Sequence, residues 1–443
     1  MSGHVRIQIM TELSIQLLPP DDAGLLDPCR IRIGTADVIF TRLLREPSNQ
    51  SDDYLLASPA ALAFWICDNW WRLRWESIPA GGPAAPWRLA HDLAAIGGGY
   101  AWPRLCIWGD VDRIGFLCHS DPVGVVGPVR YLTDALLYVG ASAFETEVDA
   151  FLDRVADRQR GFGSDRDALR ALIAALRTER DDPELARWRR LEARLGFDPD
   201  QGPDELVESA DTLANRFGLE AVEEALTAVP GGEASRTLER ELSIAREQGE
   251  VCDFSAVLSA VDPIIRDPQE APWVAAERTA GLVRAIAGIG HDPLRNKRLA
   301  DLLGVRTEVF QKVLNTSNRT YGLRLAEGAD AKSQSVSLRS RWPQARRFEL
   351  CRALGDALWS RNEVMGPLTK TSTARQKFQR TFAQSLLCPF EDLKAYLETD
   401  HPDEDDIAAA AVHFHVANRV VETVLVNKKL IERERLVDRL EAA

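Results

Sequence analysis

The pattern of hydrophobic and polar positions predicts a long helix at residues 59–77. Leu62, Trp65 and Ile66 recur at the three- and four-residue spacing that brings side chains to one helical face. Pro59 suits the first turn of such a helix, where its missing amide hydrogen costs no hydrogen bond. Further tryptophans in the same run widen the apolar face beyond one stripe, so we expect this helix to be buried on two sides.

The stretch around this helix mixes helical and strand patterns. A second helix is expected over residues 86–96, and the three glycines at 97–99 end it. Residues 104–118 read as two short strands around a Gly-Asp turn, which indicates a hairpin. We therefore expect residues 1–140 to form a tryptophan-rich α+β domain.

The middle of the chain, residues 141–262, is acidic and has the period of amphipathic helices. From Phe144 to Val155, apolar residues recur at the spacing of one helical face. Residues 183–197 begin with proline and close at a glycine, the asymmetry that marks helix ends. We expect this region to be a separate helical domain that serves as a spacer or a platform for a partner.

The third stretch, residues 263–443, opens with an expected helix over 273–289. Residues 297–315 follow as two short helices with Gly304 at the bend, an arrangement that resembles the helix-turn-helix of DNA-binding proteins. Two packed helices around a glycine are also common in any helical domain. Two strands and then further helices are expected at 321–325, 335–340, 346–359, 373–397 and 403–431. We therefore expect the whole chain to be α+β and mainly helical.

Composition places the chain among globular proteins. Of its 443 residues, 45% are hydrophobic, and no apolar run approaches the roughly 18 residues of a membrane span. The N-terminus lacks the basic start and apolar core of a secretion signal, so we expect a cytoplasmic protein that does not bind membranes. The net charge of −13 disfavours a protein that coats nucleic acid, because neutralising phosphates needs a surplus of lysine and arginine.

Cysteines and tryptophans add little chemistry of their own. The seven cysteines are scattered without a CxxC pair, so neither a zinc ribbon nor a thioredoxin-like site is indicated. Seven of the eleven tryptophans lie between Trp65 and Trp108. Such a cluster can stack nucleic-acid bases, although tryptophans at helical spacing more often pack in a core.

Three residues of the first stretch have side chains suited to acid–base catalysis. His91, Asp92 and His119 form a site only if the fold brings them together. The alternative for His91, which falls on a helix beside large aromatic residues, is a hydrogen-bonded and partly buried structural histidine.

Three motifs in the third stretch follow a known order. The segment 347-RFELCRALGD-356 precedes 382-FAQSLLCP-389, and 407-IAAAAVHFHVANRVVETVL-425 comes last. Together they resemble the ImmA/IrrE family of zincin-like metallopeptidases, in which one helix reads R-F-x-L-A-H-E-x-x-H and a later one E-A-N-x-F-A-x-x-L-L-M-P. The resemblance covers residues 265–435 and implies a metallopeptidase-like fold there.

The residues that would carry the family's chemistry are replaced. In H-E-x-x-H the two histidines hold zinc, and the glutamate acts as general base toward the bound water. The resemblance places the histidines at Arg352 and Asp356 and the glutamate at Ala353. The third zinc ligand falls on Phe378. Since arginine is not a ligand and alanine is not a base, we expect no metal, no cofactor and no catalytic residue in this domain.

The two charged replacements stand one turn apart on the expected helix. At this spacing Arg352 and Asp356 can pair. Our hypothesis is that this pair, with Phe378 over it, fills the former metal cavity. His413 and His415 are two residues apart on a helix and point to different faces, so they do not rebuild a metal site.

Residues 339–380 form a locally basic lobe in an acidic chain. Its basic residues are Arg339, Arg341, Arg346, Arg347, Arg352, Arg361, Lys370, Arg375, Lys377 and Arg380. Only Glu349, Asp356 and Glu363 oppose them. Three roles are open for this lobe: it docks on the acidic middle of the chain, binds an acidic protein partner, or contacts a nucleic-acid backbone.

These observations leave three functions, which we rank in order. The first is a non-catalytic regulatory or scaffolding protein that binds a protein partner. Members of the family act on repressors in bacterial stress response, toxin–antitoxin and phage-defence settings, so the resemblance implies a pseudoenzyme of that kind. The second is a nucleic-acid-binding regulator that uses the basic lobe 339–380 and the helical pair 297–315. The third is an enzyme with its site in the N-terminal domain.

Overall fold

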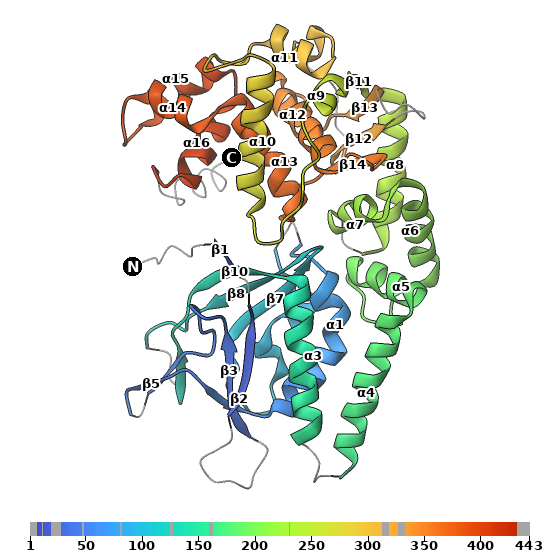
Figure 1. Cartoon of the computed structure of the whole chain (residues 1–443), viewed down its shortest axis with the longest axis vertical. Coiled ribbons are helices and arrows are strands. Elements are labelled where there is room, and N and C mark those ends of the chain that lie inside the picture. The colour runs from blue at the N-terminus through green and yellow to red at the C-terminus, as the bar shows by residue number, and fades with distance from the viewer. Residues whose placement is uncertain are drawn as a thin grey trace. The chain divides into compact units, whose positions relative to one another are not determined.

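The structure is a computed structural model of two compact units. It describes residues 7–10, 12–18, 28–46, 48–79, 82–124, 127–158, 163–229, 231–311, 319–326 and 333–431. Unit 1 contains Met1–Thr212, Pro230–Gly232 and Asp267–Glu270, and unit 2 contains Leu213–Val229, Glu233–Arg266 and Ala271–Ala443. More of the described residues lie in helices than in strands, and the strands form small, mostly antiparallel sheets (Figure 1). The expected mainly helical α+β class is therefore confirmed.

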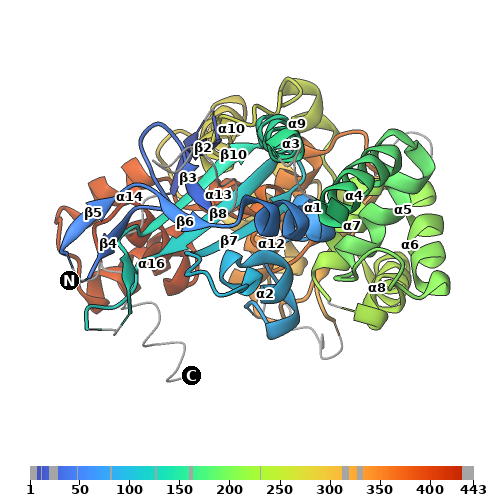
Figure 2. The ribbon, with the colours of Figure 1, turned by 90° about the horizontal axis from the view of Figure 1, so that it is seen from below.

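Unit 1 is built around a sheet with the strand order β1-β10-β8-β7. Its strands are β1 (Ile7–Met10), β7 (Arg104–Asp110), β8 (Arg113–His119) and β10 (Ala135–Gly140). Strands β7 and β8 pair antiparallel, which confirms the hairpin expected over residues 104–118 (Figure 2). The expected Gly-Asp turn is wrong, because Gly109 and Asp110 still pair with β8 and the turn is formed by Val111 and Asp112. Strand β1 pairs parallel with β10, so the sheet is mixed.

Two smaller sheets complete the strands of unit 1. One has the order β2-β3-β6 and the other β5-β4-β9. Their bounds are β2 (Ser14–Leu18), β3 (Cys29–Gly34), β4 (Leu43–Arg45), β5 (Gln50–Asp52), β6 (Leu55–Ala57) and β9 (Val129–Tyr131). Alternate residues such as Ile31 and Ile33 are buried, so β3 turns one face to the core.

Helix α1 (Pro59–Trp75) carries part of the tryptophan cluster. Ser58 caps the helix by accepting a hydrogen bond from the amide of Ala61 at 3.2 Å. The helix packs on β7 and also on α3, α4 and α5, so the expected burial on two sides is confirmed. The buried members of the cluster are Trp65, Trp70, Trp71, Trp87, Trp102 and Trp108. These side chains form core, not a platform for bases.

The expected middle domain is divided between the two units. Helices α3 (Ala141–Arg158), α4 (Gly163–Asp181) and α5 (Pro183–Arg194) belong to unit 1, as does most of α6 (Asp204–Phe217). Helices α7 (Leu219–Thr227) and α8 (Ala234–Gln248) belong to unit 2. The amphipathic faces explain this division: α3 packs on β2, β8 and β10, whereas α7 packs on β14 and α8 on β12 and β13.

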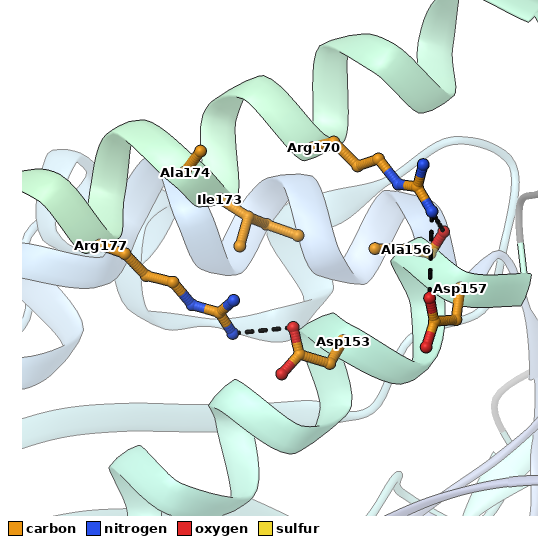
Figure 3. A pocket seen from close by; sticks show the side chains of 7 residues that line it. All are labelled: Asp153, Ala156, Asp157, Arg170, Ile173, Ala174 and Arg177. Atoms are coloured by element: carbon orange, nitrogen blue, oxygen red, sulfur yellow. Dashed lines mark hydrogen bonds and ion pairs between the residues drawn. The ribbon is translucent and has the colours of Figure 1, made fainter.

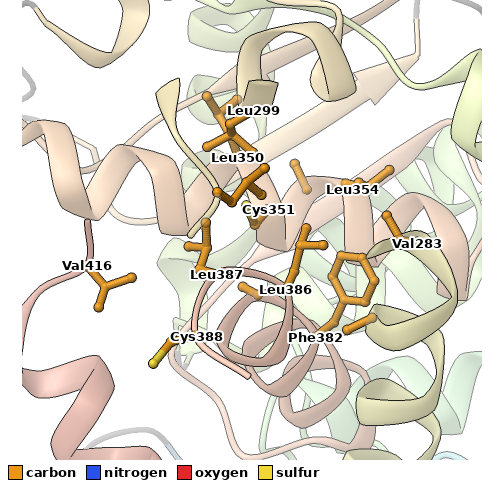
Figure 4. Packing of buried hydrophobic residues seen from close by; sticks show 14 of the residues in the cluster. Val283, Leu299, Leu350, Cys351, Leu354, Phe382, Leu386, Leu387, Cys388 and Val416 are labelled. Atoms are coloured by element: carbon orange, nitrogen blue, oxygen red, sulfur yellow. The ribbon is translucent and has the colours of Figure 1, made fainter. Parts of the chain in front are cut away.

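Unit 2 has an antiparallel sheet with the order β11-β13-β12-β14. Its strands are β11 (Glu250–Asp253), β12 (Gly322–Ala326), β13 (Ser333–Ser337) and β14 (Met365–Leu368). Helices α10 (Pro272–Ile286), α12 (Pro343–Trp359) and α13 (Ala374–Leu387) pack together beside it. Leu350, Leu354 and Phe382 are among the apolar side chains buried between these helices (Figure 4).

The remaining elements of unit 2 are short. They are α9 (Ser255–Ala260), α11 (Asn296–Leu303), α14 (Phe390–Leu397), α15 (Glu404–Phe414) and α16 (Asn418–Asn427). Helix α11 ends at Gly304, whose φ of 59° is the left-handed conformation that favours glycine. The next described element is only a 3-10 turn, Thr307–Phe310, with Phe310 buried. The rest of the helical pair expected over 297–315 lies outside the described residues.

Candidate functional site

Helix α12 carries the charged residues that the resemblance places at metal-ligand positions. Every residue from Glu349 to Trp359 is buried. Glu349, Arg352 and Asp356 are three and four residues apart, so they lie along one face of the helix. Because moving an ion out of water is costly, each of these buried charges needs partners. The identity of those partners decides what the site can do.

Asp356 is fully buried and is held by three side chains. Arg375 of α13 donates from Nε to Oδ1 at 2.7 Å and from Nη2 to Oδ2 at 3.1 Å. Arg324 of β12 donates from Nε to Oδ2 at 2.8 Å, and Gln379 of α13 donates from Nε2 to Oδ1 at 2.6 Å. A carboxylate has about four acceptor directions, so these hydrogen bonds use its capacity. We call these four residues the Asp356 cluster.

The arginines of the Asp356 cluster keep the carboxylate ionised. Burial by itself raises the pKa of Asp356, but the charges of Arg375 and Arg324 outweigh burial and hold that pKa below its usual range. Burial also works against the charge of Arg375, and Asp356 more than compensates, which raises the pKa of Arg375. Arg375 further donates to Glu363 Oε2 at 2.5 Å, so Glu363, which lies outside the cluster, opposes the charge of its second arginine.

The ion pair expected between Arg352 and Asp356 is not formed within the described part of the chain, and this hypothesis is wrong. Two arginines from other elements already hold Asp356. Arg352 turns instead toward β14 and α13. Spacing of one turn permits a pair, but Arg324 and Arg375 approach from across the site and present their donors directly to the carboxylate.

Arg352 is buried and uses one nitrogen for all its hydrogen bonds. Nη2 donates to the carbonyl oxygen of Thr369 at 2.8 Å, to Gln376 Oε1 at 2.5 Å and to Gln379 Oε1 at 3.1 Å. Its Nε is buried without a partner in the described part of the chain. Burial lowers the pKa of the Arg352 guanidinium to about 9, and the nearby charge of Arg380 acts in the same direction. The group therefore stays charged at neutral pH.

The other two replaced positions are apolar and belong to the core. Ala353 is fully buried. The ring of Phe378 lies 4.8 Å from that of Trp359 and 6.2 Å from that of Phe382. Phe378 itself makes only ring contacts. Gln376 and Gln379, which lie near it on α13, form the hydrogen bonds with the charged face of α12.

A second buried carboxylate lies beside the start of α13. Glu224 of α7 accepts hydrogen bonds on Oε1 from the hydroxyls of Thr371 at 2.7 Å and Thr373 at 2.9 Å. Thr369 is a third, longer donor at 3.4 Å. Thr373 also caps α13 by accepting from the amide of Gln376 at 3.3 Å. Glu224 thus ties α7 to the segment between β14 and α13.

The basic residues of the lobe 339–380 do not share one exposed surface. Those that are buried are Arg346, Arg347, Arg352 and Arg375. Arg361 donates to the carbonyl oxygens of Leu258, at 2.7 Å, and Val261. Arg341 and Lys370 are exposed, and Arg339, Lys377 and Arg380 are partly buried. Many of the basic residues expected at the surface are therefore buried or hydrogen-bonded inside unit 2.

His91 of unit 1 is a buried structural residue. It ends α2 (Ala85–His91), and its ring stacks on that of Trp87 at 4.0 Å. Nδ1 lies 2.6 Å from the carbonyl oxygen of Ile107, and Nε2 lies 2.8 Å from Glu76 Oε2. Arg72 donates to the same Glu76 oxygen at 2.6 Å. These contacts join α1, α2 and β7 and match the structural alternative expected for His91.

The other two candidates for acid–base catalysis have separate roles. Asp92 caps the 3-10 helix η1 (Leu93–Ile96) by accepting from the amide of Ala94 at 3.1 Å. His119 lies at the surface, 3.9 Å from Asp134. Within the described residues no hydrogen bond joins His91, Asp92 and His119, so the structure does not assemble them into a catalytic group.

The described residues contain no set of metal ligands elsewhere in the fold. No group of three His, Cys, Asp or Glu side chains there is suited to hold a metal ion. His413 stacks on Tyr396 at 4.3 Å, and His415 ends α15 with a φ of 54°. Burial raises the pKa of thiols such as Cys351 to about 12, which keeps them protonated.

A surface depression of 440 Å³ lies between α3 and α4 in unit 1 (Figure 3). Its charged side chains are already paired, since Arg177 donates to Asp153 at 2.9 Å and Arg170 lies 3.9 Å from Asp157. Ala156, Ile173 and Ala174 complete its wall. These contacts are those of two helices that hold each other, so the depression offers no free chemical group.

Comparison with known protein families, with curated proteins and with solved structures finds no match to this chain. Among the helices that the structure describes, none is both long and apolar enough to cross a membrane.

The structure adds residues that sequence reasoning missed. Arg324, Gln376, Gln379 and Glu224 complete the buried polar contacts around α12 and α13. One signal was available for Arg324, because a lone charge inside an apolar strand pattern needs a buried partner. The glutamines gave no such signal, since nothing in their spacing distinguishes a buried amide from an exposed one.

Proposed function

We propose that this chain is a non-catalytic regulatory or scaffolding protein that binds a protein partner, built on a fold similar to that of ImmA/IrrE metallopeptidases. The observation that carries the proposal is the saturation of Asp356. Its two oxygens accept hydrogen bonds from Arg324, Arg375 and Gln379. A metal ion would have to displace donors that are themselves buried charges, which costs far more than one coordination bond returns.

The other positions support the same conclusion. Arg352 is positively charged and repels a divalent cation. Ala353 supplies no base to activate water. What such a unit retains from a peptidase-like fold is a surface for a polypeptide, and function on any fold depends on its site. Binding without cleavage is the activity that fits these residues.

We also propose that the protein acts in the cytoplasm. All seven cysteines are free thiols, and all but the partly exposed Cys106 are buried. Free cysteines in this number are typical of a reducing compartment. The resemblance adds a setting for the partner, namely the repressors of stress response, toxin–antitoxin or phage-defence systems.

The test is recovery of the partner in intact form. The full-length tagged chain is used to capture proteins from its native host, in the presence of nuclease. Each captured protein is then purified and mixed with the chain in the presence of zinc. The proposal predicts a stoichiometric partner that survives nuclease and keeps its full length. Cleavage of the partner by wild-type chain, or loss of every partner on nuclease treatment, contradicts the proposal.

A further inference from the structure

His91 lies at the junction of three elements of unit 1, and both nitrogens of its ring meet oxygen atoms. The side chain is 0% exposed. Nδ1 lies 2.6 Å from the carbonyl oxygen of Ile107 on β7. Nε2 lies 2.8 Å from Oε2 of Glu76, the residue that follows α1. A carbonyl and an ionised carboxylate only accept hydrogen bonds, so each ring nitrogen has to donate.

The two contacts of His91 need two protons. A neutral imidazole carries one proton and cannot donate to both oxygens. If Nδ1 keeps that proton for Ile107, the lone pair of Nε2 points at a carboxylate oxygen 2.8 Å away. An imidazolium, with a proton on each nitrogen, satisfies both contacts. A protonated Glu76 that donates to Nε2 is the other solution, and the surroundings of Glu76 decide between the two.

The surroundings of Glu76 favour the carboxylate and hence the imidazolium. Arg72 donates from Nε to the same Oε2 at 2.6 Å, and a proton on that oxygen would remove the negative charge that the guanidinium contacts. Burial by itself raises the pKa of Glu76, but the hydrogen bonds and charges of His91 and Arg72 outweigh burial and hold that pKa below its usual range. The ring of Trp87 stacks on that of His91 at 4.0 Å, and an aromatic face attracts a cation.

Further charged or titratable groups adjoin the pair of His91 and Glu76 on the elements around it. They are Arg72, Arg88, Asp92, Cys106, Arg194 and Asp198. Cys106 of β7 stays a neutral thiol, because burial raises its pKa to about 12. Arg88 and Asp198 are exposed, and Asp92 caps η1. Of the six, Arg72 is the one that donates to the pair, so the charge of His91 is balanced mainly by Glu76.

We propose that His91 and Glu76 form a pH-sensitive latch, in which a buried imidazolium ties α2 to α1 and β7 and releases α2 when it loses a proton. The proton that leaves is the one on Nε2, and it passes to solvent. The neutral ring keeps its Nδ1 proton on the carbonyl of Ile107 and turns a lone pair toward the carboxylate, so the tie to α1 is lost. The latch is therefore complete at lower pH and opens as pH rises. It does not depend on the partner proposed above.

Nuclear magnetic resonance of the full-length chain, with isotope-labelled histidine rings, tests the proton count of the latch. The ring of His91 is identified by its through-space contact with Trp87, so the test needs no variant. We expect a proton on each ring nitrogen at neutral pH and loss of the Nε2 proton as pH rises toward about 9. A ring nitrogen without a proton at neutral pH, or an imidazolium that persists above about pH 9, overturns the latch.

Urea unfolding of wild type and Glu76→Gln gives the energetic side of the same test. At about pH 6 the unfolding equilibrium constant of the variant is expected to exceed that of wild type by about tenfold or more, and this ratio is expected to shrink as pH rises. Over the same range, amide hydrogen exchange in residues 85–96 of wild type is expected to become faster than base catalysis of exchange alone explains, because α2 is released.

His119→Gln is the matched control, since His119 lies at the surface, 3.9 Å from Asp134. It is expected to keep the pH dependence of wild type. A ratio between wild type and Glu76→Gln that stays constant with pH, or an equal change in His119→Gln, overturns the latch.

Discussion

Asp356 and Arg352 occupy the same face of α12, one turn apart, and their surroundings differ completely. Asp356 is met by donors from β12 and α13 until no acceptor direction is left. Arg352 meets three acceptors on one nitrogen, and its Nε has none among the described residues. Both side chains are buried, so exposure does not separate them. The difference teaches that burial alone does not show how strongly a charge is tied into the fold, because the number of its partners varies.

The largest expected effect is that of removing the carboxylate of the Asp356 cluster. Asp356→Ala leaves Arg324 and Arg375 buried without their counter-charge, and we expect unfolding free energy to fall by about 3–5 kcal/mol. Urea unfolding of the full-length chain measures the change. The control is Asp400→Ala, because Asp400 is exposed and lies 3.9 Å from Lys394, where a loss below about 0.5 kcal/mol is expected. Equal losses of unfolding free energy in both variants would contradict the claim that the Asp356 cluster stabilises the fold.

A smaller effect is expected from crowding the same cluster. A Cβ at Gly366 of β14 would lie 1.6 Å from Asp356 Oδ2, so Gly366→Ala has to displace that carboxylate. We expect a loss of about 1–3 kcal/mol in thermal or urea unfolding. Gly281→Ala on α10 is the matched control, since a Cβ there meets no atom within 4 Å. It is expected to gain about 0.5–1 kcal/mol from helix propensity, and a loss there as large as at Gly366 would contradict the account.

The pH dependence of stability tests whether Asp356 is ionised in the folded protein. The pKa of Asp356 is held below its usual range in the folded state. The carboxylate's contribution is therefore complete above its unfolded pKa, near about 3.9, and is lost as pH falls through the lower folded value. We expect the stability difference between wild type and Asp356→Asn to be constant from neutral pH to about 5 and to shrink in stronger acid. A stability difference between wild type and Asp356→Asn that grows as pH falls would mean that the pKa of Asp356 is raised in the folded state, not lowered.

The smallest effect on stability is expected at the other end of the face. Arg352→Met removes a buried charge to which no carboxylate of the described residues is hydrogen-bonded, and its stem is replaced by an apolar one of similar length. We expect unfolding free energy to change by less than about 1 kcal/mol, because relief of burial offsets the lost hydrogen bonds. Calorimetry or urea unfolding checks this value. A loss as large as that of Asp356→Ala would place Arg352 among the residues that hold the fold.

Local elements of this chain follow from its sequence, but the partners in its buried polar network do not. The spacing of Leu62, Trp65 and Ile66 predicted helix α1, because the period of apolar residues is a local property of the sequence. The partners of Asp356 come from positions 32 and 19 residues away. No local rule ranks such partners above Arg352, which stands at the favoured helical spacing.

The division into units shows the same limit at a larger scale. Periodicity predicted amphipathic helices over residues 141–262, and helices are found there. Periodicity shows that a helix has an apolar face and not which surface covers it. In the structure α3 is covered by the strands of unit 1 and α8 by those of unit 2, so the boundary follows the sheets and not the change in composition.

The central claim is that the charged face of α12 holds no catalytic metal, and zinc binding tests it most directly. Full-length metal-free chain is dialysed against zinc and then analysed for metal content by mass spectrometry. Because Asp356 has no acceptor direction left and Arg352 is positively charged, we predict that zinc stays well below one ion per chain. Retention of about one zinc per chain, the content of a single catalytic site, would contradict the account.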